Sequence, residues 1–173
     1  MAATQSPSSQ TWAETRGAAW RDQLDPMEAM LAPIDAPLIA ALDLTGRLRI
    51  AEIGAGGGAT TRAIATAAAK GSTIEGFDIS PDLIEAARAR AGDIAHFTLA
   101  DVADFRPMER FDRLVSRFGV MFFETPEHAL ALVRYVRLLG TSAERRAIVR
   151  VRGARFRRTP RYAVRWVLNH VSS

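Results

Sequence analysis

The chain has 173 residues, of which 48% are hydrophobic and 24% are charged; this balance fits one globular domain and excludes a collagen-like, mucin-like or wholly disordered chain. It contains no cysteine, which excludes a disulfide framework, a thiolate metal cluster and a cysteine nucleophile. The net charge of +4 is unevenly distributed, because residues 134–173 hold 11 arginines and one acid.

The first residues lack the pattern of a targeting segment. MAATQSPSSQ has neither the basic nor the apolar region of a signal peptide, and no stretch approaches the ~18 uncharged apolar residues of a membrane span. We therefore expect a cytoplasmic protein with no membrane partner. Residues 1–10 are small and polar without periodicity, which predicts a disordered end.

Residues 11–47 are predicted to form a helical prefix. Apolar residues recur at helical spacing between Trp12 and Leu42. One face of this pattern holds Leu24, Met27, Met30 and Leu31. Three prolines, Pro26, Pro33 and Pro37, are expected to divide the run into short helices.

Residues 48–140 alternate apolar runs with helical patterns. The predicted strands are 48–53, 72–78, 94–99 and 111–118, and the predicted helices are 60–70, 81–91 and 125–139, with Gly71 and Gly140 closing the first and the last helix. Strands that alternate with helices form a parallel sheet. The predicted fold class is therefore α/β: a Rossmann-like, doubly wound parallel sheet in three α/β/α layers, with the helical prefix before it and an incomplete C-terminal edge.

The second of these helices has the clearest local signals. Ser80 is a typical N-cap residue, Pro81 suits the first helical position and Asp82 places a carboxylate in the first turn. Its predicted buried stripe consists of Leu83, Ile84, Ala87 and Ala91.

A glycine-rich motif, EIGAGGG at residues 52–58, lies between the first predicted strand and the helix after it. Glycines at such a turn allow a tight bend and a close approach of the backbone to a ligand. Asp78 closes the next strand 20 residues beyond Gly58, where an acid typically accepts hydrogen bonds from ribose hydroxyls. The pattern predicts a nucleotide-type ligand, and a ligand-free turn beside a coincidental acid is the alternative.

The charge of Glu52 bears on which ligand this is. A carboxylate two residues before the first glycine would repel the pyrophosphate of a dinucleotide. S-adenosylmethionine is instead positively charged at its amine and at its sulfur. Glu52 therefore favours S-adenosylmethionine, unless its carboxylate points away into solvent.

Residues from about Trp20 to Leu139 resemble the class I S-adenosylmethionine-dependent methyltransferases, in particular the small-molecule branch related to ubiquinone and menaquinone methyltransferases. IAEIGAGGGATT looks like the first motif of that family, IEGFDISPDLIEAARARA like its second strand and the following helix, FTLADVADF like its third strand and FDRLVSRFGVMFFETP like its fourth. Ala55 stands where the family often has cysteine, although alanine is common there too.

The resemblance implies S-adenosyl-L-methionine as cofactor and a role for each matching residue. Gly54, Ala55, Gly56 and Gly58 would line the methionine moiety, with Glu52 near its amine. Asp78 would bind the ribose hydroxyls, and Ile79 would lie against the adenine. Asp101 would accept from the adenine amino group and Val102 would offer its backbone N–H. Ser116 and Arg117 would sit near the methionine and the mouth of the acceptor site, although Arg117 could equally be a solvated charge.

The expected function is methyl transfer to a small organic acceptor. This reaction depends mainly on positioning, so no catalytic residue is assigned, and His96 and His128 are expected to be structural or exposed. No residue spacing indicates a metal site. Two alternatives remain: a catalytically incomplete protein that still binds the cofactor, and an NAD-dependent oxidoreductase.

Residues 141–173 are predicted to be a basic tail with room for one further strand, at 146–152, and a helix. The stretch VRLLGTSAERRAIVRVRG lacks the Leu-x-Pro-Gly-Gly turn of the resembling family. Nucleic-acid binding is not the preferred explanation of the arginines, because no recognised fold supports it. We favour a frame-shifted, truncated end, which would leave an exposed sheet edge capable of self-association.

Overall fold

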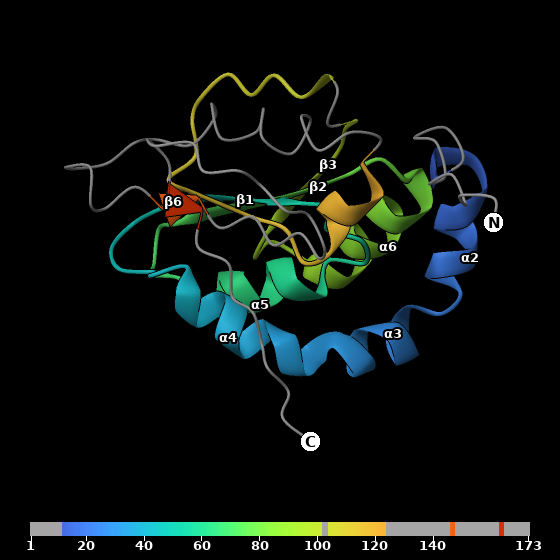
Figure 1. Cartoon of the computed structure of the whole chain (residues 1–173), viewed down its shortest axis with the longest axis horizontal. Helices are drawn as coiled ribbons and strands as arrows, with labels where there is room; N and C mark the ends of the chain where they lie inside the picture. The colour runs from blue at the N-terminus through green and yellow to red at the C-terminus, as the bar shows by residue number, and fades with distance from the viewer. Residues whose placement is uncertain (1–11, 102–103, 124–145, 148–162, 165–173) are drawn as a thin grey trace.

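The structure is a computed structural model that describes residues 12–101, 104–123, 146–147 and 163–164. Its central sheet consists of β1 (Arg49–Ile53), β2 (Thr73–Asp78), β3 (His96–Leu99) and β4 (Arg113–Val115). All pairings are parallel, and the strand order is β3-β2-β1-β4. Helices α5 (Ala59–Ala67) and α6 (Pro81–Ala91) connect β1 to β2 and β2 to β3 (Figure 1). The predicted parallel α/β sheet is confirmed.

This strand order places β1 between β2 and β4. Glu52 is aligned with Gly76 of β2 on one side and with Val115 of β4 on the other. In a parallel sheet all the carboxyl ends lie at one edge, and ligands bind where neighbouring connections diverge. The glycine loop that follows β1 therefore lies between the carboxyl ends of β2 and β4.

The helical prefix consists of a short π-helical turn η1 (Trp12–Arg16), helices α2 (Gly17–Arg21) and α3 (Leu24–Leu31), the 3-10 turn η2 (Ala32–Ile34) and helix α4 (Asp35–Ala41). Pro26 and Pro37 each occupy the third position of their helix, where an N–H group has no intrahelical partner and proline is tolerated. Leu24 is buried as predicted, but Met30 is 63% exposed and does not belong to the buried face.

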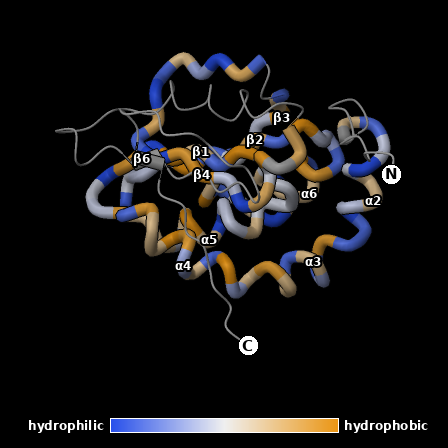
Figure 2. The backbone as a smooth tube through the Cα atoms, viewed as in Figure 1, coloured by the Kyte–Doolittle hydropathy of each residue, from blue (hydrophilic) through white to orange (hydrophobic). Residues whose placement is uncertain are grey.

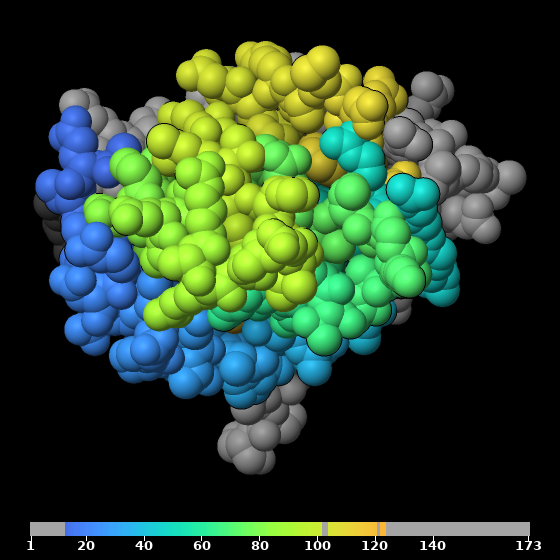
Figure 3. All heavy atoms as spheres, turned by 180° about the vertical axis from the view of Figure 1, so that it is seen from behind, coloured from blue at the N-terminus to red at the C-terminus, as the bar shows by residue number. Residues whose placement is uncertain are grey.

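The prefix packs along the helices that cover the sheet. Figure 3 shows its residues in blue, directly against the green atoms of α5 and α6. Arg21 of α2 forms an ion pair with Asp82 of α6 at 2.8 Å. The prefix thus adds a further set of helices on the same side of the sheet as α5 and α6.

Two apolar clusters cover the two faces of the sheet. The larger cluster joins the sheet to its helices and includes Leu42, Ile50, Ile64, Ile84 and Val115. The smaller cluster, on the opposite face, contains Phe77, Phe105 and Phe111, with the rings of Phe77 and Phe105 edge to face at 4.7 Å. Figure 2 shows apolar segments along β1 and β2 and within α4 and α5. The predicted helix at 125–139, which would complete a third layer, lies outside the described residues.

The predicted boundaries are accurate for α6 but not for all elements. The hydroxyl of Ser80 accepts from the N–H of Leu83 at 3.4 Å, and the predicted stripe of α6 is buried. Helix α5 ends at Ala67, so Gly71 lies in the turn before β2 and is not the predicted helix cap. Strand β4 stops at Val115 instead of residue 118, because the chain turns at Phe118 (φ +68°) into the 3-10 helix η4 (Gly119–Phe122).

The described part of residues 141–173 consists of two short strands. β5 (Arg146–Ala147), which begins where a fifth strand was predicted, pairs in parallel with β6 (Ala163–Val164). The rest of the predicted basic tail, like residues 1–10, lies outside the described residues. Among the helices that the structure describes, none has the length and apolar character needed to cross a membrane.

Candidate cofactor and acceptor site

The glycine loop after β1 is tied to the end of β2 by its own backbone. The N–H groups of Gly54 and Ala55 both donate to the carbonyl oxygen of Phe77, at 2.8 and 3.0 Å. Gly54, Gly56 and Gly58 have φ values of +70°, +56° and +81°, a region that side chains disfavour. A Cβ atom at Gly54 would lie 2.6 Å from the Cα of Gly119, whereas one at Gly56 would meet no atom within 4 Å. The loop therefore packs tightly at Gly54 and is open at Gly56.

Asp78 lies at the end of β2, beside this loop. Its Oδ2 accepts from the N–H of Gly56 at 2.8 Å, and its Oδ1 accepts from the N–H of Ser80 at 3.0 Å. Burial raises the pKa of Asp78, while the hydrogen bonds from Ser80, Gly56 and Ile79 oppose that rise. Backbone donors on both oxygens fix the orientation of this carboxylate in the wall of the site.

A cavity of about 410 Å³ opens at the carboxyl ends of β1, β2 and β4. This volume lies in the range typical of small-molecule sites. Seven of the ten predicted cofactor residues line it: Glu52, Gly54, Ala55, Gly56, Asp78, Ile79 and Asp101. Val102, another of the ten, lies outside the described residues.

The other two predicted residues, Gly58 and Ser116, do not line the cavity. A Cβ at Gly58 would lie 2.6 Å from the ring of Phe97, so this glycine allows α5 to pack closely on β3. The Ser116 hydroxyl donates to the carbonyl oxygen of Ile53 at 2.6 Å and accepts from the N–H of Val120 at 3.2 Å. Ser116 therefore joins the ends of β1 and β4 instead of facing the cavity as expected.

Glu52 is buried in the floor of the cavity. It is 1% exposed, which excludes the alternative of a solvated surface carboxylate. The Thr61 hydroxyl donates to its Oε2 at 2.5 Å. Burial raises the pKa of Glu52 to about 8, against the opposing effects of Thr61 and of the Arg117 charge. Burial thus favours the neutral form of this carboxyl, and a positive charge bound nearby would favour its ionised form.

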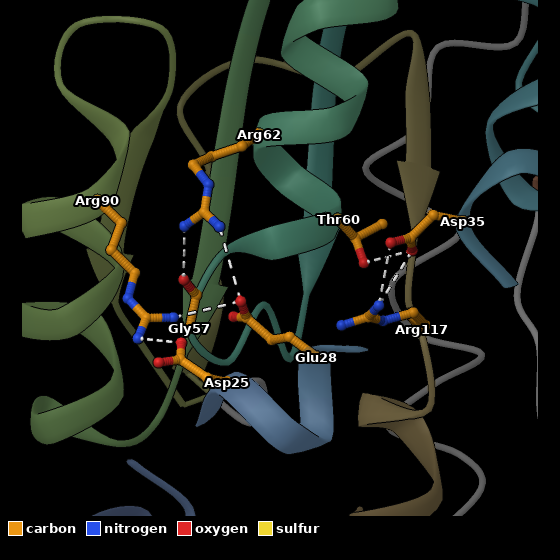
Figure 4. Close-up of polar contacts among 8 residues, drawn as sticks. All are labelled: Asp25, Glu28, Asp35, Gly57, Thr60, Arg62, Arg90 and Arg117. Carbon is orange, nitrogen blue, oxygen red and sulfur yellow. Dashed lines mark hydrogen bonds and ion pairs between the residues drawn. The ribbon is translucent and has the colours of Figure 1, made fainter. Parts of the chain in front are cut away.

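Arg117 also lines the cavity, and it is not the solvated charge of the alternative interpretation. Its side chain is 10% exposed, and its Nη1 donates to both carboxylate oxygens of Asp35 at 3.1 Å. The Thr60 hydroxyl donates to the same Asp35 at 2.8 Å (Figure 4). One polar cluster thereby joins the prefix through Asp35, helix α5 through Thr60 and the segment after β4 through Arg117.

The prefix contributes a wall of the cavity, which was not predicted from the sequence. Its lining residues are Trp20, Leu24, Met27, Glu28 and Leu31. Glu28 interacts with Arg62 of α5 at 3.6 Å and with Arg90 of α6 at 3.2 Å, and Asp25 interacts with Arg90 at 2.8 Å (Figure 4). One sequence feature could have indicated this wall: Glu28 is a charged residue four positions after Leu24, on the buried face of α3.

Gly57 belongs to the glycine motif but was not predicted to have a role of its own. It sets how closely the prefix approaches the loop. A Cβ at this position would lie 2.5 Å from Cδ2 of Leu24 and 2.6 Å from Oε1 of Glu28. Helix α3 therefore contacts the loop backbone where the side chain is absent.

Among the described residues, no group of three or more acids and histidines is placed to hold a metal ion.

The fold is a Rossmann-like parallel sheet, and its site is a glycine loop with an acid on each side, Glu52 and Asp78. These features are typical of proteins that bind a nucleotide-type cofactor. The family model described as "Methyltransferase domain" matches residues 50–141, more than half of the chain. The chain therefore belongs to the methyltransferase domain family, and the resemblance to class I methyltransferases is confirmed. The finer assignment to the ubiquinone and menaquinone branch stays a prediction.

Individual relatives agree with this family. An uncharacterized protein of Mycobacterium tuberculosis is 31% identical over 141 residues, which cover 76% of this chain and 50% of the relative. A trans-aconitate 2-methyltransferase of M. tuberculosis is 33% identical over 99 residues, which cover 57% of this chain and 36% of that protein. The chain thus spans about half or less of the length of these curated relatives.

Solved structures share the fold. Magnesium protoporphyrin IX methyltransferase from Synechocystis, with bound S-adenosylhomocysteine, aligns with a TM-score of 0.58 at 17% identity and covers 74% of this chain and 66% of its own. The plantazolicin methyltransferase BpumL, in complex with a pentazolic desmethylPZN analog and S-adenosylhomocysteine, aligns with a TM-score of 0.60 at 19% identity, over 75% of this chain and 52% of that chain.

Proposed function

We propose that this protein binds S-adenosylmethionine in the cavity and transfers its methyl group to a small organic acceptor. The observation that carries the proposal is the pairing of the open glycine at position 56 with the carboxylate of Asp78. The cofactor supplies a methyl group already activated on a positively charged sulfur. What the chain must then provide is binding, orientation and exclusion of water.

The lining residues suit the two halves of this cofactor. Asp78, the last residue of β2, and Asp101, which comes after β3, both line the cavity, and this supports their roles as acceptors for the ribose hydroxyls and the adenine amino group. The glycine loop and Glu52, at the end of β1, suit the methionine half, whose amine is cationic. Space next to Gly56, where a Cβ would meet no protein atom, is what close contact with a ligand requires.

The remaining walls suit an organic acceptor. Trp20, Leu31, Phe118, Phe122 and Phe123 add apolar surface to the lining of the cavity, and Trp20 and Phe122 meet edge to face at 6.4 Å. Relatives and structural neighbours are named as methyltransferases of trans-aconitate, magnesium protoporphyrin IX and plantazolicin. Their diversity supports a small-molecule acceptor and does not identify one.

Calorimetric titration with S-adenosylmethionine, S-adenosylhomocysteine and NAD tests the proposal. We expect both adenosyl compounds to bind and NAD not to bind, because Glu52 is a buried carboxyl that the cationic amine of the adenosyl compounds stabilises in its ionised form, whereas a pyrophosphate finds no positive partner in it. Methyl-labelled S-adenosylmethionine with a panel of small acceptors then tests transfer. Binding of NAD alone would favour the oxidoreductase, and cofactor binding without transfer to any acceptor would favour the catalytically incomplete alternative.

A further inference from the structure

The cavity combines four acids with a single cation among the described residues. The acids are Glu28, Glu52, Asp78 and Asp101, and the cation is Arg117. A guanidinium whose side chain is only 10% exposed needs acceptors for its five N–H donors. The partners of Arg117 therefore indicate what else the cavity receives.

Asp35 occupies only one of the three nitrogens of Arg117. Both oxygens of Asp35 accept from Nη1, at 3.1 Å. The described part of the chain offers no hydrogen-bond acceptor to Nε or Nη2, and Figure 4 shows the other terminal nitrogen pointing away from Asp35. Both nitrogens are accessible from the cavity or solvent. Among the described residues, the fully buried side-chain polar atom without a partner is Oε1 of Glu28, so Nε and Nη2 of Arg117, which have no partner, are not fully buried.

The unoccupied edge has the geometry of a carboxylate receptor. The Nε–H and one Nη2–H of a guanidinium are parallel, and together they match the two oxygens of a carboxylate. Asp35 holds the guanidinium from the other end, and Thr60 in turn holds Asp35 at 2.8 Å. We infer that Arg117 recognises a carboxylate group of a ligand in the cavity, with Asp35 and Thr60 as its positioning residues.

This inference rests on the proposed function, and two ligands could supply the carboxylate. One is the methionine end of the cofactor, because Arg117 lies after β4, beside the β1 loop. The other is an acidic acceptor bound against the apolar residues that line the cavity. Asp35 already compensates the Arg117 charge, so a bound carboxylate gains mainly from directional hydrogen bonds and from the positive sulfur and amine of the cofactor.

The first arm of the test compares S-adenosylmethionine with its decarboxylated form, which retains the amine. We would titrate both into wild-type protein, Arg117→Gln and a control, Arg47→Gln, which removes an arginine that donates to the carbonyl oxygen of Gly71 and does not line the cavity. If the cofactor supplies the carboxylate, Arg117→Gln binds S-adenosylmethionine about tenfold or more weakly, because charge-assisted hydrogen bonds are lost. The decarboxylated form binds wild type and Arg117→Gln equally, which also shows that the variant is folded.

The second arm tests an acceptor carboxylate. Protein saturated with S-adenosylhomocysteine is titrated with benzoate and phenylacetate, and with benzamide as an uncharged analogue. If the acceptor supplies the group, a carboxylate binds wild type at least about tenfold more tightly than Arg117→Gln, and benzamide does not distinguish the two proteins. Asp35→Asn should weaken the same interaction, because it frees the guanidinium to reorient.

The outcomes separate this inference from the proposed function. Equal binding of S-adenosylmethionine to wild type and Arg117→Gln, with no carboxylate-dependent binding in the second arm, would overturn the role of Arg117 while leaving the cofactor site intact. If wild-type protein bound neither form of the cofactor, the proposed function would be wrong and the inference would fail with it.

Discussion

The backbone N–H of Gly56 donates a hydrogen bond of 2.8 Å to Oδ2 of Asp78. This contact joins the glycine loop after β1 to the acid that ends β2, and the two residues are 22 positions apart. The other carboxylate oxygen of Asp78 is held by Ser80, the N-cap residue of α6. Loop, strand end and helix start are thus oriented by one carboxylate, which gives Asp78 a structural role beside its proposed role in binding.

Replacing Asp78 should therefore weaken cofactor binding strongly. In Asp78→Ala the ribose loses its charged acceptor and the loop loses its tether, and each charge-assisted hydrogen bond is worth about 1.5–3 kcal/mol. We expect the dissociation constant of S-adenosylhomocysteine, measured by calorimetry, to rise about tenfold or more. Asp82→Ala is the matched control, because Asp82 also lies at the start of α6 but pairs with Arg21 and does not line the cavity. Unchanged affinity in Asp78→Ala would contradict the assignment.

Gly56→Val should block binding while leaving the fold intact. The new side chain would occupy space that contains no protein atom, and its backbone cost at φ +56° is about 1–2 kcal/mol. Gly46→Val is the control, because Gly46 has φ +78° and equally open surroundings but does not line the cavity. Both variants should lose similar thermal stability, and only Gly56→Val should lose the cofactor. Loss of binding in both would indicate that backbone strain, not obstruction of the cavity, is responsible.

Stability should fall as the pH rises through the titration range of Glu52. Burial raises the pKa of this carboxyl from 4.5 to about 8, so between these values the folded protein holds a proton that the unfolded chain has released. The free energy of unfolding then decreases with pH, by an amount on the order of 1–5 kcal/mol, until about pH 8. Asp78, whose pKa is also raised, acts in the same direction.

Glu52→Gln tests this pH dependence. The amide does not titrate, so the fall in melting temperature between pH 5 and 8 should become smaller than in wild type. Glu75→Gln provides a matched control, because Glu75 is also a β-strand glutamate that accepts from a threonine, Thr98, at 2.7 Å, but it does not line the cofactor cavity. A wild-type stability that is flat over this pH range would show that Glu52 is ionised in the folded protein.

Gly57→Ala should displace helix α3 from the loop. The added Cβ would lie 2.5 Å from Leu24 Cδ2, and overpacking of this kind typically costs about 1–3 kcal/mol. We expect lower thermal stability and weaker cofactor binding, because α3 forms one wall of the cavity. The double variant Leu24→Ala/Gly57→Ala removes the Leu24 contact, one of the two close contacts of the new Cβ, and should recover part of the affinity relative to Gly57→Ala. No recovery would mean that the Leu24 contact is not what weakens binding in Gly57→Ala.

Features that depend on local chemistry were predictable from the sequence. Ser80 and Pro81 start α6 because a hydroxyl cap and a fixed φ angle act within one turn. The glycine loop and Asp78 were identified because their spacing reflects one strand–helix–strand unit. Those same signals led to the cofactor class and to seven of the residues that line the cavity.

Features that depend on distant segments were decided by the tertiary structure. The sequence places Asp35 and Arg117 82 residues apart, and no local pattern predicts that their side chains meet. Nor does it reveal that Gly58 faces Phe97, or that Ser116 joins β1 to β4 instead of facing the ligand. These contacts arise only when the prefix packs along α5 and α6 and when β4 takes its place beside β1. The sequence by itself determined the part of the cavity wall made by the glycine loop and Asp78, because one continuous unit carries both. The cavity wall made by the prefix and the free edge of Arg117 depend on long-range packing.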